Sequence, residues 1–377
     1  MKSFLFPLVL AGFIASSVSA QTSAADWYEK GNSLKNDEDY KGAMNAFKKA
    51  VSLDAKHKLA LHQLAWCYNE LSMYNEAIDV LKKEAKLNPS FPEKNNFELG
   101  FAYKGLENYE EALKYLNKAI SIDGNYALAF KERGKCYFEL QNYESALNDF
   151  NRYETLEDDI DEADFYYDKG WIENDLGQYN DAVESLKKCL ELDDSYTDGY
   201  SELGFAYYKL NLNNEAVRNY RVAIEQDPAD YHPVIWMGDV YFDNIRDYDS
   251  AIVYYEKGLN LYKKDKVAFY KLGWCYNDKE RYSAAVTPLK EAVKLDPNYD
   301  EALTELGFAY YKMEQYDMAL TQYNSVISRN DKDELCRYSA GLCYYAKNDQ
   351  ASLKRMISEL SALNSTKYVE ELTKYIK

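Results

Sequence analysis

Residues 203–208 have the sequence Leu-Gly-Phe-Ala-Tyr-Tyr, and the same six residues return at 306–311. The glycine of this stretch belongs to a longer series in which a small residue recurs every 34 to 36 positions. A second small residue, alanine, follows each of the first nine members after twelve or thirteen positions. The first series is Gly31, Ala65, Gly100, Gly134, Gly170, Gly204, Gly238, Gly273, Gly307 and Gly341. Two such series in phase predict a solenoid of helix–turn–helix units.

These units resemble tetratricopeptide repeats. The stretch at 203–208 matches the first helix of that family, and Ala216, Tyr220, Ala223 and Pro228 match its second helix and closing proline. The resemblance implies an all-α fold: a right-handed α-solenoid superhelix of about ten repeats over residues 24–363, with a capping helix at 364–377. The expected units are 24–57, 58–91, 93–126, 127–160, 163–196, 197–230, 231–265, 266–299, 300–333 and 334–363.

The repeat has a physical basis that does not depend on the family. A small residue in each helix of a pair lets the two axes approach to about 8–10 Å, and we expect the two small residues to face each other. Tyrosines placed just before the second helix, such as Tyr179 and Tyr282, are expected to fill the turn. One pair cannot bury its apolar face alone, so neighbouring pairs must stack.

A longer period lies above the single repeat. The second, fifth and eighth units carry a tryptophan after the small residue: Trp66, Trp171 and Trp274. The unit after each of them carries Leu-Gly-Phe-Ala-Tyr. We infer a block of three repeats that is present three times, and we expect any binding site to recur once per block.

Positions 2, 5, 9 and 12 of each first helix fall on one face by the 3.6-residue period. The family resemblance implies that this face lines a concave groove. It is rich in rings, and carboxylates stand beside them at position 6, so the face predicts a groove that holds an extended partner segment. The alternative is that the rings pack against the next unit and the carboxylates form an ordinary solvated face. The candidate partner-binding residues are Trp66, Phe101, Phe138, Trp171, Phe205, Tyr208, Phe242, Trp274, Phe308, Tyr311, Glu98, Glu132, Asp168 and Glu202.

Three functions remain open at this level. The first is a non-catalytic scaffold or adaptor that binds a protein or peptide in the groove. The second is a carbohydrate or peptidoglycan binder, because tryptophan with Asn174, Asn277 or Asp175 nearby suits sugar rings and hydroxyls. The third is a structural platform that assembles through the convex face. A net charge of −18 favours neutral or basic partners and disfavours nucleic acid.

The motifs of catalysis and metal binding were sought without success. There is no phosphate-binding glycine loop, no nucleophile elbow and no paired-cysteine metal spacing, so we expect no enzyme activity, metal or cofactor. The basic clamp that some relatives use for a terminal carboxylate is also missing, because positions 2 and 6 carry Lys94 with Glu98 and Leu128 with Glu132.

The first twenty residues have the pattern of a cleavable signal peptide. Lys2 is followed by an apolar stretch and by the small residues Val18-Ser19-Ala20. No cysteine stands at the expected cut to carry a lipid, and no later segment is apolar enough for stable membrane insertion. We therefore expect a periplasmic or secreted protein. The six cysteines lie at repeat positions typical of buried side chains, which favours unpaired thiols over disulfides.

Overall fold

The structure is a computed structural model that describes residues 23–87 and 89–376. Within these residues every regular element is a helix. The predicted signal segment at 1–20 lies outside the described residues. The chain divides into two compact units, residues 1–160 and 161–377, and each is described by itself. No sequence feature predicted this division, which falls in the non-helical acidic segment 157–162 between the fourth and fifth repeats.

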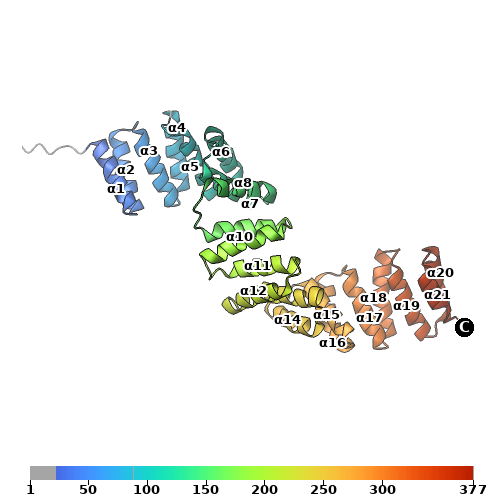
Figure 1. Ribbon diagram of the computed structural model, residues 1–377. Helices are drawn as coiled ribbons and strands as arrows, with labels where there is room; N and C mark the ends of the chain where they lie inside the picture. Colours follow the sequence, from blue (N-terminus) through green and yellow to red (C-terminus); the bar gives the residue numbers. More distant parts are fainter. Residues whose placement is uncertain (1–22, 88, 377) are drawn as a thin grey trace, which may run out of the picture. The chain divides into compact units, whose positions relative to one another are not determined.

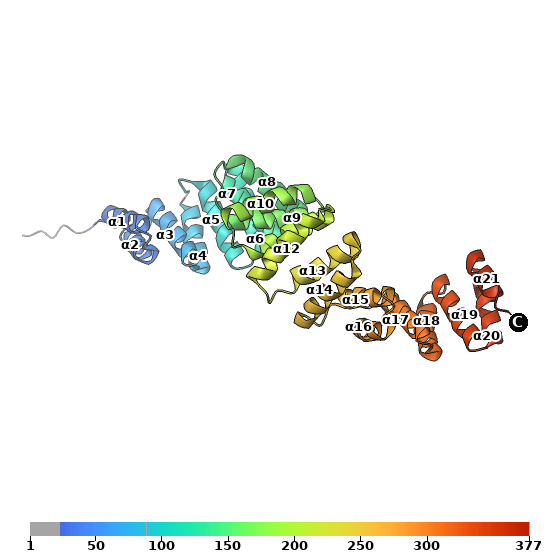
Figure 2. The ribbon, with the colours of Figure 1, turned by 60° about the horizontal axis from the view of Figure 1, so that its bottom comes forward.

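Unit 1 contains four helical pairs, drawn in blue to green in Figures 1 and 2. Its helices are α1 (Ala24–Asn36), α2 (Tyr40–Leu53), α3 (Lys58–Glu70), α4 (Tyr74–Lys86), α5 (Pro92–Gly105), α6 (Tyr109–Ile122), α7 (Ala127–Glu139) and α8 (Tyr143–Leu156). Each odd-numbered helix packs against the even-numbered helix that follows it, and then against the second helix of the preceding pair. Each pair is one predicted repeat.

Unit 2 continues the same pattern, from green to red in Figure 1. Its helices are α9 (Ala163–Asp175), α10 (Tyr179–Leu192), α11 (Thr197–Lys209), α12 (Asn213–Gln226), α13 (His232–Asp239), η1 (Val240–Ile245), α14 (Tyr248–Leu261), α15 (Lys266–Asp278), α16 (Tyr282–Leu295), α17 (Asp300–Lys312), α18 (Tyr316–Arg329), α19 (Glu334–Ala346), α20 (Gln350–Ala362) and α21 (Thr366–Thr373). The first helices of neighbouring repeats, such as α9 and α11, also contact one another. The chain is thus an all-α solenoid of helical pairs, as the sequence predicts.

The glycines of the first helices pack differently from our expectation. Gly204 lies against the ring of Tyr220, four residues beyond the small Ala216, and Gly170 lies in the same way against Leu186. A Cβ atom on Gly204 would stand 2.7 Å from Tyr220 Cδ1. The glycine therefore makes room for a large side chain of the second helix rather than for the facing alanine. The reason is that a fully buried Tyr or Leu fills the volume between the helices, which two small residues would leave empty.

The turn inside each pair uses a left-handed residue. Gly177 has φ +74°, and non-glycine residues take the same place in the other repeats, for example Glu314 at φ 59°. The next residue donates its N–H back to the carbonyl five positions earlier, as Leu212 does to Tyr207 at 2.9 Å. This closing pattern satisfies carbonyls that the helix end would leave unpaired.

The seventh repeat departs from the others in its first helix. The helix is α-helical as α13 and then π-helical as η1. Here the closing bond runs from Asp247 N–H to the carbonyl of Tyr241, one residue further back than elsewhere. The sequence contains the cause, because Ala251 stands thirteen positions after Gly238, whereas the spacing in the other repeats is twelve. A π-turn absorbs one inserted residue without breaking the helix.

Buried cysteines belong to the interior of the solenoid. All six thiols are buried, and burial raises the pKa of each of them, including Cys189 and Cys275, to about 12. Such thiols stay protonated at neutral pH, so they act as small apolar groups. Their burial agrees with the packing role expected from their repeat positions.

Candidate functional site

One cavity of about 360 Å³, called site A here, lies on the face formed by the first helices of unit 2. Its walls come from α9, the start of α10, α11 and α13. The residues that line it are Trp171, Asn174, Asp175, Tyr179, Glu202, Phe205, Lys209 and Trp236. They meet because positions 9, 12 and 13 of one first helix face positions 6, 9 and 13 of the next.

A hydrogen-bonded pair joins the two first helices at site A. Asn174 Nδ2 donates to the backbone oxygen of Glu202 at 3.0 Å and to its Oε2 at 2.9 Å. Both partners are acceptors, which determines the orientation of the amide. Asn174 is only 4% exposed, and its Oδ1 has no hydrogen-bond partner among the described residues. A buried acceptor without a donor is unusual in a protein interior.

Aromatic rings form the rest of the wall. Phe205 lies with its ring centroid 5.6 Å from that of Trp236 and 6.4 Å from that of Tyr179. The ammonium of Lys209 stands 5.1 Å from the Phe205 centroid, within the range of a cation–π contact. Within the described residues Lys209 forms no ion pair, although the carboxylates of Asp175 and Glu202 line the same cavity.

Burial disfavours the charged form of the Glu202 carboxylate. It raises the pKa of Glu202 to about 6, against the opposing effect of the Asn174 hydrogen bond. The same cause raises the pKa of Glu305 and of Glu98. A carboxylate kept in such surroundings is a candidate for a functional role.

A second cavity, site B, of about 380 Å³, repeats site A within unit 2. Asn277 Nδ2 donates to Glu305 O at 3.0 Å and to Glu305 Oε2 at 2.8 Å, and Asn277 Oδ1 again lacks a partner among the described residues. The Lys312 ammonium stands 5.6 Å from the Phe308 ring centroid. Seven lining residues lie 103 positions after their equivalents in site A: Trp274, Asn277, Asp278, Tyr282, Glu305, Phe308 and Lys312.

The equivalent place in unit 1 has the same Asn–Glu pair in different surroundings. Asn69 Nδ2 again donates to Glu98, at 3.1 Å to the backbone oxygen and at 2.6 Å to Oε2. Where sites A and B have a lysine, unit 1 has Gly105, and the ring of Tyr74 lies directly against it. The Asn–Glu pair therefore recurs once per three-repeat block, but the surroundings of the pair differ in the first block.

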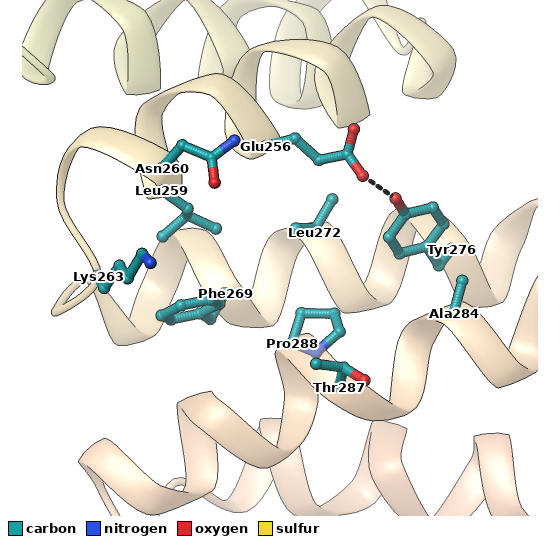
Figure 3. A pocket seen from close by; sticks show the side chains of 10 residues that line it. All are labelled: Glu256, Leu259, Asn260, Lys263, Phe269, Leu272, Tyr276, Ala284, Thr287 and Pro288. Atoms are coloured by element: carbon teal, nitrogen blue, oxygen red, sulfur yellow. Dashed lines mark hydrogen bonds between the residues drawn. The ribbon is translucent and has the colours of Figure 1, made fainter.

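The opposite face of unit 2, formed by second helices, has cavities of its own. One of them, of about 520 Å³, lies between α14, α15 and α16. Figure 3 shows Glu256 and Tyr276 on one side of it, joined by a hydrogen bond from the phenol, and Phe269 on another. Pro288 stands inside α16 and removes the N–H that would bond the Ala284 carbonyl. A related cavity, of about 530 Å³ and lined by Tyr200 and Tyr207, lies two repeats earlier.

The predicted binding residues separate into groups in the structure. Trp171, Phe205 and Glu202 meet in site A, and Trp274 and Phe308 meet in site B. All the predicted rings are partly exposed. Neither a fully open ring surface for a partner nor complete packing against the next repeat therefore describes them.

Other predicted residues lie outside these two cavities and contact their own neighbours. Tyr208 donates its hydroxyl to Asp243 Oδ2 at 2.8 Å. Glu132 forms an ion pair with Lys104 and is buried, as is Glu98, so these two carboxylates do not belong to a solvated face. The remaining rings of this group contact other rings, within their own repeat or in a neighbouring one: Phe101, Phe138, Phe242, Tyr311 and Trp66. Asp168 also has an interaction with another residue.

Sequence reasoning did not select several residues of the sites. Tyr179 and Tyr282 were assigned to the turn, yet both also line a cavity. Lys209, Lys312 and Trp236 were not singled out. The 103-residue spacing would have found the two lysines, because they recur with the tryptophans in the same register.

The described residues contain no group of three or more His, Cys, Asp or Glu side chains arranged to hold a metal ion. They also contain no helix with the length and apolarity that crossing a bilayer requires.

The structure thus defines a helical repeat protein with ligand-sized cavities on its first-helix face. Known family models agree with that class. One model, described as the TPR repeat, matches residues 170–211 and 275–314. Two models described as the tetratricopeptide repeat match residues 27–57, 94–126, 234–265, 59–89 and 301–332. The chain belongs to the tetratricopeptide repeat family, whose members are typically non-catalytic scaffolds for protein interactions.

Individual relatives are distant. The chain is 26% identical to BBSome complex member BBS4 of Bos taurus over 63% of its own length and 38% of the relative. It is 22% identical to the Hsp70-Hsp90 organizing protein of Triticum aestivum over 53% of its own length and 40% of the relative. The chain thus spans about two fifths of these relatives. A solved structure, the C-terminal part of a TPR repeat-containing protein from Cytophaga hutchinsonii, is similar with a TM-score of 0.48 and 18% identity, covering 65% of this chain and 99% of that one.

Proposed function

We propose that this chain is a non-catalytic scaffold that binds an extended segment of a partner protein along the first-helix face of unit 2. The observation that carries the proposal is the recurrence of site A as site B, with seven lining residues in the same register. The three-repeat block predicts that residues recur, and the structure shows that the recurring rings and polar groups line a cavity in both blocks of unit 2, which the stacking of a solenoid does not require.

The chemistry of the two sites indicates what kind of partner would bind. Rings offer contact area with little loss of conformational entropy, which is why aromatic residues concentrate at binding hot spots. The carboxylates and the net charge of −18 favour a neutral or basic segment. The Hsp70-Hsp90 organizing protein, one of the relatives, has a name that describes the organisation of other proteins.

The location is part of the proposal. The signal-like pattern of the first twenty residues and the missing lipid-bearing cysteine support export to the periplasm or the exterior. We therefore place the scaffold in the cell envelope or the secreted space. Cutting of the chain before Gln21 in exported material, determined by N-terminal sequencing, would support this placement, and an uncut cytoplasmic chain would contradict it.

A second candidate is a carbohydrate binder of the envelope. The observation in its favour is that Trp171 lies beside the Asn174 amide and the Asp175 carboxylate in one cavity, a combination that suits a sugar ring and its hydroxyls. Binding of the purified chain to a glycan array, lost in Trp171→Ala, would favour this candidate over the protein scaffold.

The test of the leading proposal is affinity capture from the native envelope fraction, read by quantitative mass spectrometry. Trp171→Ala/Phe205→Ala removes two rings of site A, and we expect it to reduce capture of the partner at least tenfold. Tyr200→Ala/Phe269→Ala removes rings from the opposite face and is the matched control, with capture unchanged. Circular dichroism establishes that both variants are folded. Capture of the partner by the site A variant at the level of the unmodified chain would refute the proposal.

A further inference from the structure

Sites A and B present acceptors to whatever enters them. In site A the carboxylates of Asp175 and Glu202 line the cavity, and Glu202 Oε1 has no hydrogen bond from the described residues. Site B repeats this pair of carboxylates with Asp278 and Glu305. A ligand that satisfies these oxygens has to bring hydrogen-bond donors, and a donor that carries a positive charge bonds a carboxylate most strongly.

The ring walls of the first-helix face hold cations within the chain itself. Lys209 stands over Phe205 and Lys312 over Phe308, at 5.1 and 5.6 Å from the ring centroids, and among the described residues neither forms an ion pair. In unit 1 the Lys35 ammonium stands 3.7 Å from the ring centroid of Trp66. Positive groups therefore lie on these rings even where no carboxylate bonds to them.

From this chemistry we propose that sites A and B each bind one basic side chain of the partner, a guanidinium or an ammonium, so that unit 2 recognises a segment with two basic residues. The inference rests on the proposed function, because it concerns the same face and the same partner. A guanidinium fits better than an ammonium, since its plane stacks on a ring while its five N–H groups reach carboxylates. Lys209 and Lys312 are exposed, so such a ligand displaces them to solvent.

The equivalent place in unit 1 provides an internal control. There Tyr74 lies against Gly105 where sites A and B have lysines, and the Lys35 ammonium stands over the Trp66 ring. Since a cation of the chain already lies on this tryptophan, we expect the place to bind no basic ligand. Trp66→Ala is therefore a matched control for the same residue type at the same repeat position.

The experiment uses the full mature chain and a synthetic peptide with two arginines joined by a flexible Gly/Ser linker, in a series of linker lengths. Its control peptide has citrulline, which keeps the shape of arginine and removes the charge. Isothermal titration at low salt measures affinity, and tryptophan fluorescence reports entry into the sites. We expect the best arginine peptide to bind at least tenfold more tightly than its citrulline counterpart, because two linked contacts act together.

The variants separate the contributions. Trp171→Ala and Trp274→Ala should each weaken binding of the arginine peptide about tenfold, and together abolish it, while Trp66→Ala leaves it unchanged. The double variant Glu202→Gln/Glu305→Gln keeps the side-chain shape, and we expect it to weaken binding of the arginine peptide several-fold. It tests the two sites independently of the folding of the tryptophan variants. Lys209→Met/Lys312→Met should strengthen binding, because it removes the competing cations.

Three results would overturn the inference: equal affinity for the citrulline peptide, weaker binding after Lys209→Met/Lys312→Met, or binding of a neutral oligosaccharide in place of the arginine peptide. If partner capture still depends on Trp171 and Phe205 while the arginine peptides do not bind, the scaffold proposal stands and only this inference fails.

Discussion

The Glu202 side chain lies where burial disfavours the charged form of its carboxyl group. Burial raises its pKa to about 6, whereas its ordinary value is 4.5. The folded state therefore holds this proton more tightly than the unfolded state, so the free energy of unfolding falls as pH rises from about 4.5 to 6.

We predict that Glu202→Gln stabilises unit 2 above pH 6. The amide keeps an acceptor for Asn174 and removes the buried charge, so the gain in free energy of unfolding should approach roughly 1–2 kcal/mol at pH 7.5 and vanish below pH 4.5. Urea unfolding at several pH values, followed by circular dichroism, measures the difference. Glu184→Gln, at an exposed position of α10, should show no such dependence on pH. A gain from Glu202→Gln that is the same at pH 4.5 and 7.5 would contradict this origin.

The left-handed turn residues lead to a second prediction. Gly177→Ala places a Cβ in a conformation that L-residues disfavour, so it should lower the free energy of unfolding by about 1 kcal/mol. Glu314→Gly at the equivalent turn, at φ 59°, relieves the same strain and should be neutral or mildly stabilising. Thermal unfolding measures the change in stability for both variants. A stabilising Gly177→Ala together with a destabilising Glu314→Gly would show that the turns are not strained.

At the residue scale, the sequence predicted part of the site. Trp171 and Phe205 were selected because the helical period places them on one face, and Glu202 because its carboxylate stands beside that face; the three do share a cavity. Trp236 was missed because it stands at position 6, where most repeats have a carboxylate. The Asn174–Glu202 bond was missed because it joins two helices whose mutual register only the packed structure determines.

The element that differs most from its equivalents is the π-helical segment η1. Its inserted residue places Asn244 so that Nδ2 donates to Tyr208 O at 3.0 Å and to Asn213 Oδ1 at 2.9 Å. Lys271 bonds both Asp239 and Asp243 from the next first helix, at 2.7 and 3.0 Å. These contacts join the seventh repeat to the repeats on both sides of it.

We predict that deletion of Asn244 converts η1 into an α-helix and leaves the solenoid folded. The deletion restores the twelve-residue spacing of the other repeats, while it removes the bonds to α11 and α12. Helical content should stay unchanged, and hydrogen exchange near Tyr208 should become faster, since its carbonyl loses a partner. Unfolding of unit 2 by this deletion would show that the π-turn is essential to the stack.

The elements themselves could be predicted well. A 34-residue period with small residues in phase predicts paired helices, and the structure has them over the described residues. What the period could not reveal is the partner of each small residue. The alternation of Leu, Phe and Tyr at the position that packs on Gly170 or Gly204 is decided by volume, and many side chains satisfy the same spacing.

At the scale of the whole molecule, the chain consists of two compact units, and the boundary along the sequence lies between residues 160 and 161. In a solenoid each repeat contacts chiefly its neighbours, so stability is close to a sum over neighbouring pairs. Unit 1 has its own core around Phe47 and Leu81, and unit 2 has one around Tyr255 and Leu289. Each unit should therefore hold its structure by itself.

We predict that residues 23–160 and 161–377 fold as separate fragments. Each should show helical circular dichroism and a cooperative thermal transition, because each contains at least four stacked pairs. Analytical ultracentrifugation of the separate and mixed fragments tests whether they need each other. A fragment that becomes helical only on mixing would show that the two units form a single cooperative structure.

The central claim is that a partner binds on the first-helix face of unit 2, at sites A and B. Photo-crosslinking in the cells that produce the protein tests it most directly, with a photoreactive phenylalanine placed at Phe205 or Phe308 in the sites and at Tyr200 or Phe269 on the opposite face. The account predicts that positions 205 and 308 crosslink to the same partner, and that positions 200 and 269 do not. Crosslinks from 200 and 269 alone would contradict it.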